Sequence, residues 1–302
     1  MRAFFSDHFV LPLPQGHRFP MEKYRLLRER IAEYADITLA VPEAATSQAL
    51  ERVHTTDYVA RVTQGELTRE EIRRIGFPWS RALVERSRRS VGGTLAAGGA
   101  ALEDGVSVNL AGGTHHAFVD HGEGFCVFND VAVAIRTLQA TVELNRCAVL
   151  DLDVHQGNGT ATIFAEDDTV FTLSVHGANN FPFRKEQSDL DIELTDRASD
   201  ADFLESVSIG VKQALSHGAD LAFFIAGADP FEGDRLGRLS VSKDGMAERD
   251  SIVFEACERA GIPVAVVMSG GYAHDVTDTV DIHESTIRIA AQSMVPKRLE
   301  DT

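Results

Sequence analysis

Short apolar runs alternate with longer stretches of helical periodicity along most of the chain. The runs that predict strands are Ser107–Leu110, Arg146–Leu150, Val170–Ser174, Leu221–Ala226 and Pro263–Met268. The stretches that predict helices are Met21–Tyr34, Glu43–Val53, Ser80–Leu102, Asp130–Leu144, Asp200–His217 and Lys243–Ala260. Continuous apolar strands separated by helices are typical of a mostly parallel sheet covered on both faces, so the pattern predicts an α/β fold. No long linker, repeat or low-complexity tract interrupts it, and we expect residues 1–302 to form a single domain.

Small or polar residues follow each predicted strand from Arg146 onward. The segments are 151–155, 174–177, 227–229 and 269–272. Open α/β sheets bind their ligands at the carboxyl ends of parallel strands. We therefore expect these residues to converge on one edge of the sheet.

The segment Asp151-Leu-Asp153-Val-His155 has the spacing of a metal site. Side chains two residues apart in an extended segment face the same side, so Asp153 and His155 can reach one ion with Asp151 behind them. Asp229, after another strand, is a candidate third ligand. Carboxylate and imidazole ligands suit zinc, and three protein ligands leave one position for water. Acidic residues at strand ends also cap helices and form turns, so this segment alone leaves both interpretations open.

Two glycine-rich segments add candidate proton-transfer and hydrogen-bonding groups. In Gly112-Gly-Thr-His115-His116, imidazoles that titrate near neutrality could exchange a proton with bound water, or could simply belong to a polar loop. In Gly270-Gly271-Tyr272, the tyrosine hydroxyl could stabilise an oxyanion, or the segment could be a turn beside a core aromatic.

The chain carries 29 basic and 46 acidic residues, a net charge of −17. This balance argues against direct binding of nucleic acid, which needs a basic surface. It would suit a cationic partner such as a lysine-rich peptide or a polyamine, although a solvated acidic surface accounts for most of the excess.

No apolar run is long enough to span a membrane, and the N-terminus lacks a signal-peptide pattern. Cys126, Cys147 and Cys257 are widely spaced and form no Cys-x-x-Cys motif, which argues against both a disulfide framework and a thiolate zinc site. We therefore expect a cytoplasmic protein.

Taken together, the motifs resemble those of the histone deacetylase superfamily, which includes acetylpolyamine amidohydrolases. They are Gly-Gly-x-His-His-Ala from Gly112, Gly-Phe-Cys-x-x-Asn-Asp from Gly124, Asp-x-Asp-x-His-x-Gly-x-Gly from Asp151, Gly-x-Asp from Gly227 and Ser-Gly-Gly-Tyr from Ser269. The resemblance extends from Gly16-His17 through His54-x-x-Asp57-Tyr58 to Tyr272. It implies the arginase–deacetylase fold, and the Asp151 motif is more similar to the class IV branch and its bacterial relatives than to class I.

The resemblance also implies ligands for two cations. The family's zinc ligands correspond to Asp153, His155 and Asp229, and Fe²⁺ or Co²⁺ are alternative ions for such a site. A structural K⁺ or Na⁺ site corresponds to Asp151, Asp153, His155 and Ser174, mainly through main-chain carbonyls.

Further roles follow from the same resemblance. His116 corresponds to the general base and acid, His115 with Asp151 to an electrostatic partner, and Tyr272 to the oxyanion donor. The residues expected to line an acyl-lysine tunnel are Gly124, Phe125, Phe181, Leu236 and Gly271. Cys126 is interpreted as a packing residue.

Asn158 departs from the pattern of many members, which place a buried aspartate behind the second histidine. An asparagine can hold the imidazole ring but supplies no charge. We therefore expect His116 to have a lower pKa than in an aspartate-supported pair, which favours a neutral base.

The resemblance implies a zinc-dependent deacylase acting on ε-acyl-lysine in proteins or peptides. An amidohydrolase for acetylated polyamines or another small amide is the alternative, and a non-catalytic acyl-lysine binding module is disfavoured because all six metal, histidine and tyrosine positions are intact. The sequence leaves the acyl length, the physiological substrate and the oligomeric state open.

Overall fold

A computed structural model describes residues 1–293, which fold around one eight-stranded sheet. The strands are β1 (Arg2–Phe4), β2 (Thr38–Ala40), β3 (Val106–Asn109), β4 (Cys147–Asp151), β5 (Val170–Gly177), β6 (Leu190–Leu194), β7 (Leu221–Ile225) and β8 (Val264–Val267). Their order in the sheet is β2-β1-β3-β8-β7-β4-β5-β6, and all neighbouring strands are parallel. The predicted single α/β domain with a parallel sheet is confirmed.

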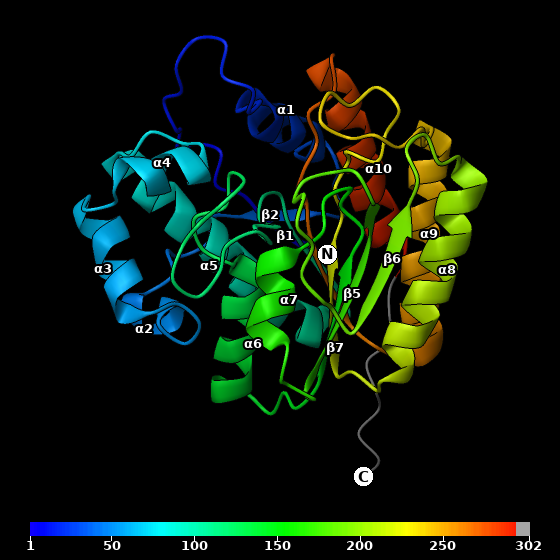
Figure 1. Cartoon of the computed structure of the whole chain (residues 1–302). Coiled ribbons are helices and arrows are strands. Elements are labelled where there is room, and N and C mark those ends of the chain that lie inside the picture. The colour runs from blue at the N-terminus through cyan, green and yellow to red at the C-terminus, as the bar shows by residue number, and fades with distance from the viewer. Residues whose placement is uncertain (294–302) are drawn as a thin grey trace.

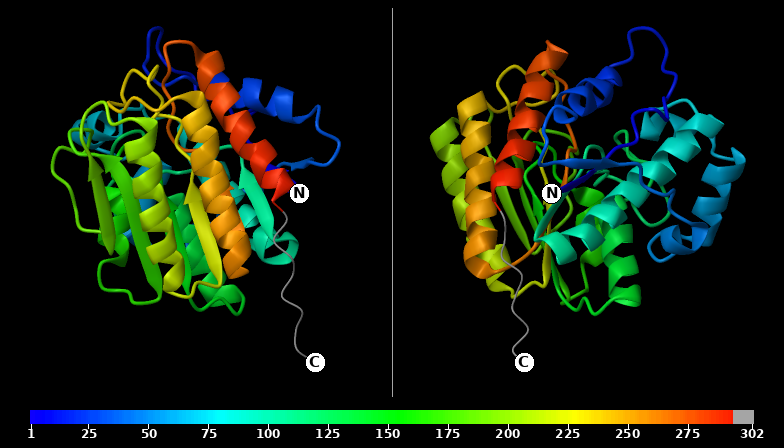
Figure 2. Two further views of the ribbon diagram at one scale, coloured as in Figure 1. Left: turned by 90° about the vertical axis from the view of Figure 1, so that its right-hand side faces the viewer. Right: turned by 180° about the vertical axis from the view of Figure 1, so that it is seen from behind.

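Helices cover both faces of this sheet (Figures 1 and 2). Their bounds are α1 (Glu22–Ile31), α2 (Ser47–Leu50), α3 (Thr56–Gln64), α4 (Arg69–Ile75), α5 (Arg81–Asp104), α6 (Asp130–Thr141), α7 (Asn158–Phe164), α8 (Asp200–Ser216), α9 (Lys243–Ala260) and α10 (Val276–Gln292). Helices α8, α9 and α10 pack on one face, and α5 and α6 pack on the other, each with its own apolar core. A third core joins α2, α3 and α4 to α5. Among residues 1–293, no helix has both the length and the apolar composition needed to cross a bilayer.

The five strands predicted from apolar runs are all present, and so are the six predicted helices. The helix expected over Glu43–Val53 is shorter and spans Ser47–Leu50. Its start is set by Thr46, which caps it by accepting a hydrogen bond from Ala49 N. Strands β1, β2 and β6 were not predicted. β1 and β2 have only three residues each, and β6 is a partly exposed edge strand with alternating polar positions.

Four adjacent central strands deliver the candidate chemistry to one edge. The loops after β3, β8, β7 and β4 carry, respectively, the paired histidines, the Gly-Gly-Tyr segment, Asp229 and the Asp-x-Asp-x-His segment. Parallel strands end at the same edge, so segments far apart in the sequence meet there. The expected convergence is confirmed for 151–155, 227–229 and 269–272, whereas 174–177 is not a segment after a strand but the end of β5 (Val170–Gly177) itself.

Candidate active site

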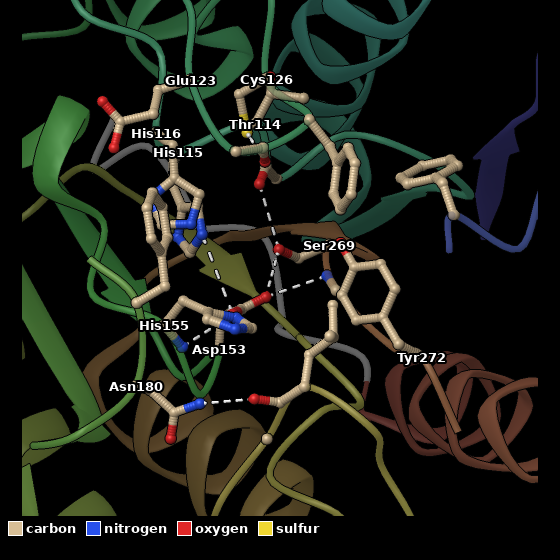
Figure 3. A pocket seen from close by; sticks show the side chains of 18 of the residues that line it. Thr114, His115, His116, Glu123, Cys126, Asp153, His155, Asn180, Ser269 and Tyr272 are labelled. Carbon is tan, nitrogen blue, oxygen red and sulfur yellow. Dashed lines mark hydrogen bonds and ion pairs between the residues drawn. The ribbon is translucent and has the colours of Figure 1, made fainter. Parts of the chain in front are cut away.

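A cavity of about 790 Å³ opens at this edge of the sheet (Figure 3). Five side chains from three of these loops line its base, and a sixth, Asp229 from the fourth loop, lies 3.2 Å from His155. All six are at least nine-tenths buried. We call them the cavity floor: His115, His116, Asp153, His155, Asp229 and Tyr272. Figure 3 shows the two histidines on one side, Tyr272 on the other, and Asp153 with His155 between them. The structure thus brings together the residues that the sequence motifs singled out.

Three potential metal-ligand atoms converge on the floor. One ligand atom from each of Asp153, His155 and Asp229 lies within 4.8 Å of the other two. His155 Nδ1 is 2.9 Å from Asp153 Oδ1 and 3.2 Å from Asp229 Oδ2. Asp229 Oδ2 is buried and accepts no hydrogen bond of good geometry from residues 1–293.

The second oxygen of each carboxylate is held by the protein. Asp153 Oδ2 accepts hydrogen bonds from Ser269 Oγ at 2.8 Å and Gly270 N at 3.0 Å, while Asp229 Oδ1 accepts one from Val154 N at 2.9 Å. These bonds orient one oxygen of each carboxylate toward His155. The oxygen–nitrogen–oxygen donor set, with one acceptor lacking a hydrogen bond, fits zinc or a similar divalent ion.

The pKa values of His155 and Asp229 also favour a divalent ion at this site. Burial alone would lower the pKa of His155, but Asp153 and Asp229 raise it to about 10. Burial and the neighbouring charge of Asp153 raise the pKa of Asp229 to about 7. Two carboxylates that are buried so deeply need a nearby positive charge to balance them, and a proton on His155 supplies it here. A divalent ion would supply the same compensation, and its binding would release protons.

The two adjacent histidines have different partners. His115 Nδ1 lies 2.7 Å from Asp151 Oδ2, and His116 Nδ1 lies 2.7 Å from Asn158 Oδ1. Because both partner oxygens are acceptors, each Nδ1 donates its proton. The His116 ring therefore presents the lone pair of Nε2 when it is neutral.

The pKa values of His115 and His116 diverge, because the partner of His115 is a carboxylate and the partner of His116 is a neutral amide. Burial would lower the pKa of His115, but Asp151 and then Asp153 reverse this and raise it to about 9. Burial lowers the pKa of His116 well below its ordinary value, and the charges of His115 and His155 lower it further. Near neutral pH, His115 is thus a buried cation beside a neutral His116.

Tyr272 is held from behind by two groups that the sequence motifs did not indicate. Asp234 Oδ2 accepts a hydrogen bond from Tyr272 N at 2.6 Å. The buried Lys23 of α1 donates to Ser269 O at 2.9 Å and approaches Gly271 O at 3.5 Å. Burial, and then the charges of Asp229 and Asp153, raise the pKa of Tyr272 well above its usual value. The hydroxyl therefore stays protonated and can act as a hydrogen-bond donor.

The walls of the cavity include four of the five residues predicted to line a tunnel: Gly124, Phe125, Phe181 and Leu236. The Phe181 ring packs edge-on against His116, with ring centroids 4.9 Å apart. Gly124 has a φ of 54°, and a Cβ there would lie 2.7 Å from the His116 ring. A side chain at Gly124 would therefore collide with the proposed base.

The prediction that Gly271 lines the tunnel is corrected by the structure. Of the described residues, Gly270 and Tyr272 line the cavity and Gly271 does not. Gly271 has a φ of 140° and turns away, so that a Cβ there would meet Thr279 at 2.6 Å and His283 at 3.4 Å. The glycine allows the chain to pass close to α10 behind the wall.

Ser174 and Cys126 also lie near the floor. Ser174 is the β5 partner of Asp151 on β4, and its buried Oγ is 2.9 Å from His176 Nδ1. The predicted monovalent-cation site at these residues stays a prediction. Burial raises the pKa of Cys126 well above its ordinary value, so its thiol is protonated and poorly nucleophilic, in line with a packing role.

Asp130 orients the loop that carries the paired histidines. Its carboxylate accepts hydrogen bonds from Gly113 N at 3.0 Å and from Thr114 N at 2.7 Å. Asp130 belongs to the Asn-Asp motif, so the sequence pointed to it without indicating this role. Lys23 and Asp234 belong to no motif, and only the three-dimensional packing reveals them.

Comparison with known proteins places this site in a family. Residues 17–286 match the model of the histone deacetylase domain. An uncharacterized protein of Picosynechococcus sp. is 44% identical over 290 residues, which are 95% of this chain and 97% of that protein. Histone deacetylase 2 of Arabidopsis thaliana is 31% identical over 217 residues, 70% of this chain and 56% of that protein.

A solved structure with the same fold is the HDA15 HD domain, which matches with a TM-score of 0.82 at 21% identity, over 96% of this chain and 90% of that one. The fold is therefore the arginase–deacetylase fold that the resemblance implied. The match to the family model includes every residue of the cavity floor. The chain belongs to the histone deacetylase family.

Proposed function

We propose that this protein is a zinc-dependent deacylase that hydrolyses the ε-amide of acyl-lysine. The observation that carries the proposal is the cavity floor, which combines three convergent ligand atoms with a neutral imidazole, His116, and a protonated tyrosine, Tyr272, in one cavity. Amide hydrolysis needs activated water, a proton acceptor and a donor for the developing oxyanion, and the floor supplies a candidate for each.

Asp153, His155 and Asp229 would hold the zinc ion. The chemistry that zinc supplies in such a site is a lower pKa for water and polarisation of the amide carbonyl. Fe²⁺ or Co²⁺ would suit the same donors, and a K⁺ or Na⁺ ion near Asp151 and Ser174 would brace the ligand loop.

The remaining floor residues divide the proton transfers between them. His116 Nε2 accepts a proton from the attacking water and later delivers it to the lysine amine as the amide bond breaks. The Tyr272 hydroxyl donates a hydrogen bond to the tetrahedral oxyanion. His115, held as a cation by Asp151, stabilises negative charge on the reacting centre and keeps its neighbour His116 neutral.

Phe125 and Phe181 in the cavity wall suit a substrate with a linear aliphatic arm. The lysine side chain is such an arm, and its acyl amide would reach the floor while the rest of the substrate stays at the opening.

A matched substrate panel tests the proposal. Initial rates would be measured on acetyl-, octanoyl- and myristoyl-lysine peptides beside N-acetylputrescine and N-acetylspermidine, with zinc-loaded protein and with Tyr272→Phe. We expect turnover of at least one acyl-lysine peptide that is largely lost in the variant. Turnover of the polyamines alone, or no turnover on any member despite bound zinc, would contradict the proposal.

A further inference from the structure

The opening of the cavity carries positive charge on a chain that is strongly acidic. Four arginines line it, and we call them the arginine rim: Arg18, Arg74, Arg235 and Arg238. Apart from the metal-ligand candidate Asp153, Glu123 is the one acidic residue among the described residues lining this cavity. The chain as a whole has a net charge of −17, so the charge at the opening is the reverse of the overall charge.

Two arginines of the rim have no acidic partner within residues 1–293. The Arg235 guanidinium donates from Nε to Tyr272 O at 2.8 Å and from Nη2 to Arg18 O at 3.3 Å, so two main-chain carbonyls fix it without neutralising it. Arg18 is exposed, and its side chain makes no ion pair within the described part of the chain.

Within residues 1–293, the ion pairs that the other two arginines form are solvent-exposed. Arg238 lies 3.2 Å from Asp196, and Arg74 lies 3.7 Å from Glu70. Exposed pairs of this kind contribute little, because water screens them. Four guanidinium groups around one opening repel each other unless an anion joins them, and a concave site lined by one sign of charge concentrates ligands of the opposite sign.

We propose that the substrate is an ε-acyl-lysine that presents a carboxylate to the arginine rim. This inference rests on the proposed deacylase function and narrows its substrate. The planar guanidinium forms paired hydrogen bonds with carboxylates, and Arg235 is already oriented beside Tyr272. The carboxylate could belong to an acidic residue flanking the acyl-lysine or to the main-chain carboxylate of a free acyl-lysine. Acetylated polyamines carry extra positive charge, and the rim would repel them.

A binding measurement tests the charge preference without relying on turnover. The probes are suberic monohydroxamic acid, its terminal carboxamide and an amine-terminated alkyl hydroxamate, titrated calorimetrically into zinc-loaded protein. We expect the carboxylate probe to bind roughly three- to tenfold more tightly than the carboxamide at low ionic strength, the amine probe to bind weakest, and the differences to shrink in high salt.

A charge-reversal variant and a matched control locate the effect. Arg18→Glu should remove most of the carboxylate preference and leave the carboxamide affinity within about twofold, because the Arg18 side chain is exposed and makes no ion pair within residues 1–293. Arg259→Glu, at an exposed position near the end of α9 and outside the cavity lining, makes the same change in net charge and should alter neither affinity. Equal binding of the carboxylate and carboxamide probes, or an equal loss in both variants, would overturn the inference.

Turnover then separates the two sources of the carboxylate. Initial rates would compare an acetyl-lysine peptide flanked by glutamate with its glutamine counterpart, and α-benzoyl-ε-acetyl-lysine with its carboxamide. A preference for the acid form in either pair supports the inference and identifies the source. Turnover without any acid preference would overturn it, while leaving the deacylase function intact. A carboxylate preference in binding, with no turnover on any substrate, would support the rim and contradict the deacylase function.

Discussion

The floor and the opening of the cavity differ in burial and in how their charges are balanced. At the floor, Asp153 and Asp229 are at most 1% exposed, and both are fixed by hydrogen bonds from neighbouring loops. At the opening, the arginine rim is exposed, and Phe183 is 83% exposed. We infer that the floor performs the reaction on any substrate that reaches it, whereas the opening selects the substrate. Substitutions at the two places should therefore fail in different ways.

The largest effect is expected at the metal ligands. Asp229→Ala removes one of three candidate ligand atoms, so zinc content measured by elemental analysis should fall far below one per chain, and activity should be lost on every substrate. Arg238→Gln, at the opening of the same cavity, is the control and should keep its zinc. Full zinc retention and activity in Asp229→Ala would show that the floor is not the metal site.

Tyr272→Phe should give the next largest loss. Removing a single oxyanion donor lowers kcat by about 10²- to 10³-fold. The affinity for zinc should stay unchanged, because the substitution leaves the three candidate ligands Asp153, His155 and Asp229 in place. The measurement is kcat on an acetyl-lysine peptide together with the metal content. A variant that retained wild-type kcat would remove Tyr272 from the reaction.

Asn158, the hydrogen-bond partner of His116, should influence the position of the acidic limb of the pH–rate profile through the pKa of His116. Burial and the charge of His115 hold the pKa of His116 well below the ordinary value, so the neutral base persists into mildly acidic solution. Asn158→Asp adds a carboxylate 2.7 Å from Nδ1 and should raise this pKa. The base is then protonated at a higher pH, and the acidic limb of kcat/KM should move upward by about one pH unit.

The Asn158→Gln variant serves as the neutral control for that shift, since it adds no charge. An acidic limb that stays in place in Asn158→Asp would assign the titration to another group.

The smallest effect is expected at the opening. Phe183→Ala removes an exposed ring, so the free energy of unfolding should change by no more than about 0.5 kcal/mol. KM for an acyl-lysine peptide should rise by a few-fold, while kcat and the zinc content stay constant. A loss of kcat comparable to that of Tyr272→Phe would abolish the distinction between floor and opening.

The difference between the cavity floor and its opening also explains which residues could be predicted from the sequence. The floor residues lie in short motifs directly after apolar strands, and parallel strands bring their carboxyl ends together whatever the details of packing. Asp153, His155, His116 and Tyr272 can therefore be selected from the sequence alone. The five central strands were predictable for a similar reason, because buried strands are continuous apolar runs.

The residues behind the floor and the residues of the arginine rim are brought together by contacts between segments far apart in the sequence, and no local sequence pattern predicts these contacts. Lys23 is an ordinary lysine in a predicted helix, yet it lies behind the Tyr272 loop, 246 residues away along the chain from its carbonyl partner Ser269. Arg18 and Arg235 meet at the rim although 217 residues separate them. Such residues become visible only when the whole fold is assembled, and this is also why the acidic composition suggested a cationic partner while the opening of the cavity is positive.

The central claim is that the floor is a zinc-dependent hydrolytic site, and a metal titration tests it most directly. Zinc would be added stepwise to chelator-stripped protein while initial rates are followed on an acetyl-lysine peptide whose flanking residues are glutamate. The account predicts no activity without metal, a linear rise that stops at one zinc per chain, and no response in Asp229→Ala. Activity in the stripped protein, or an equal response in the variant, would contradict it.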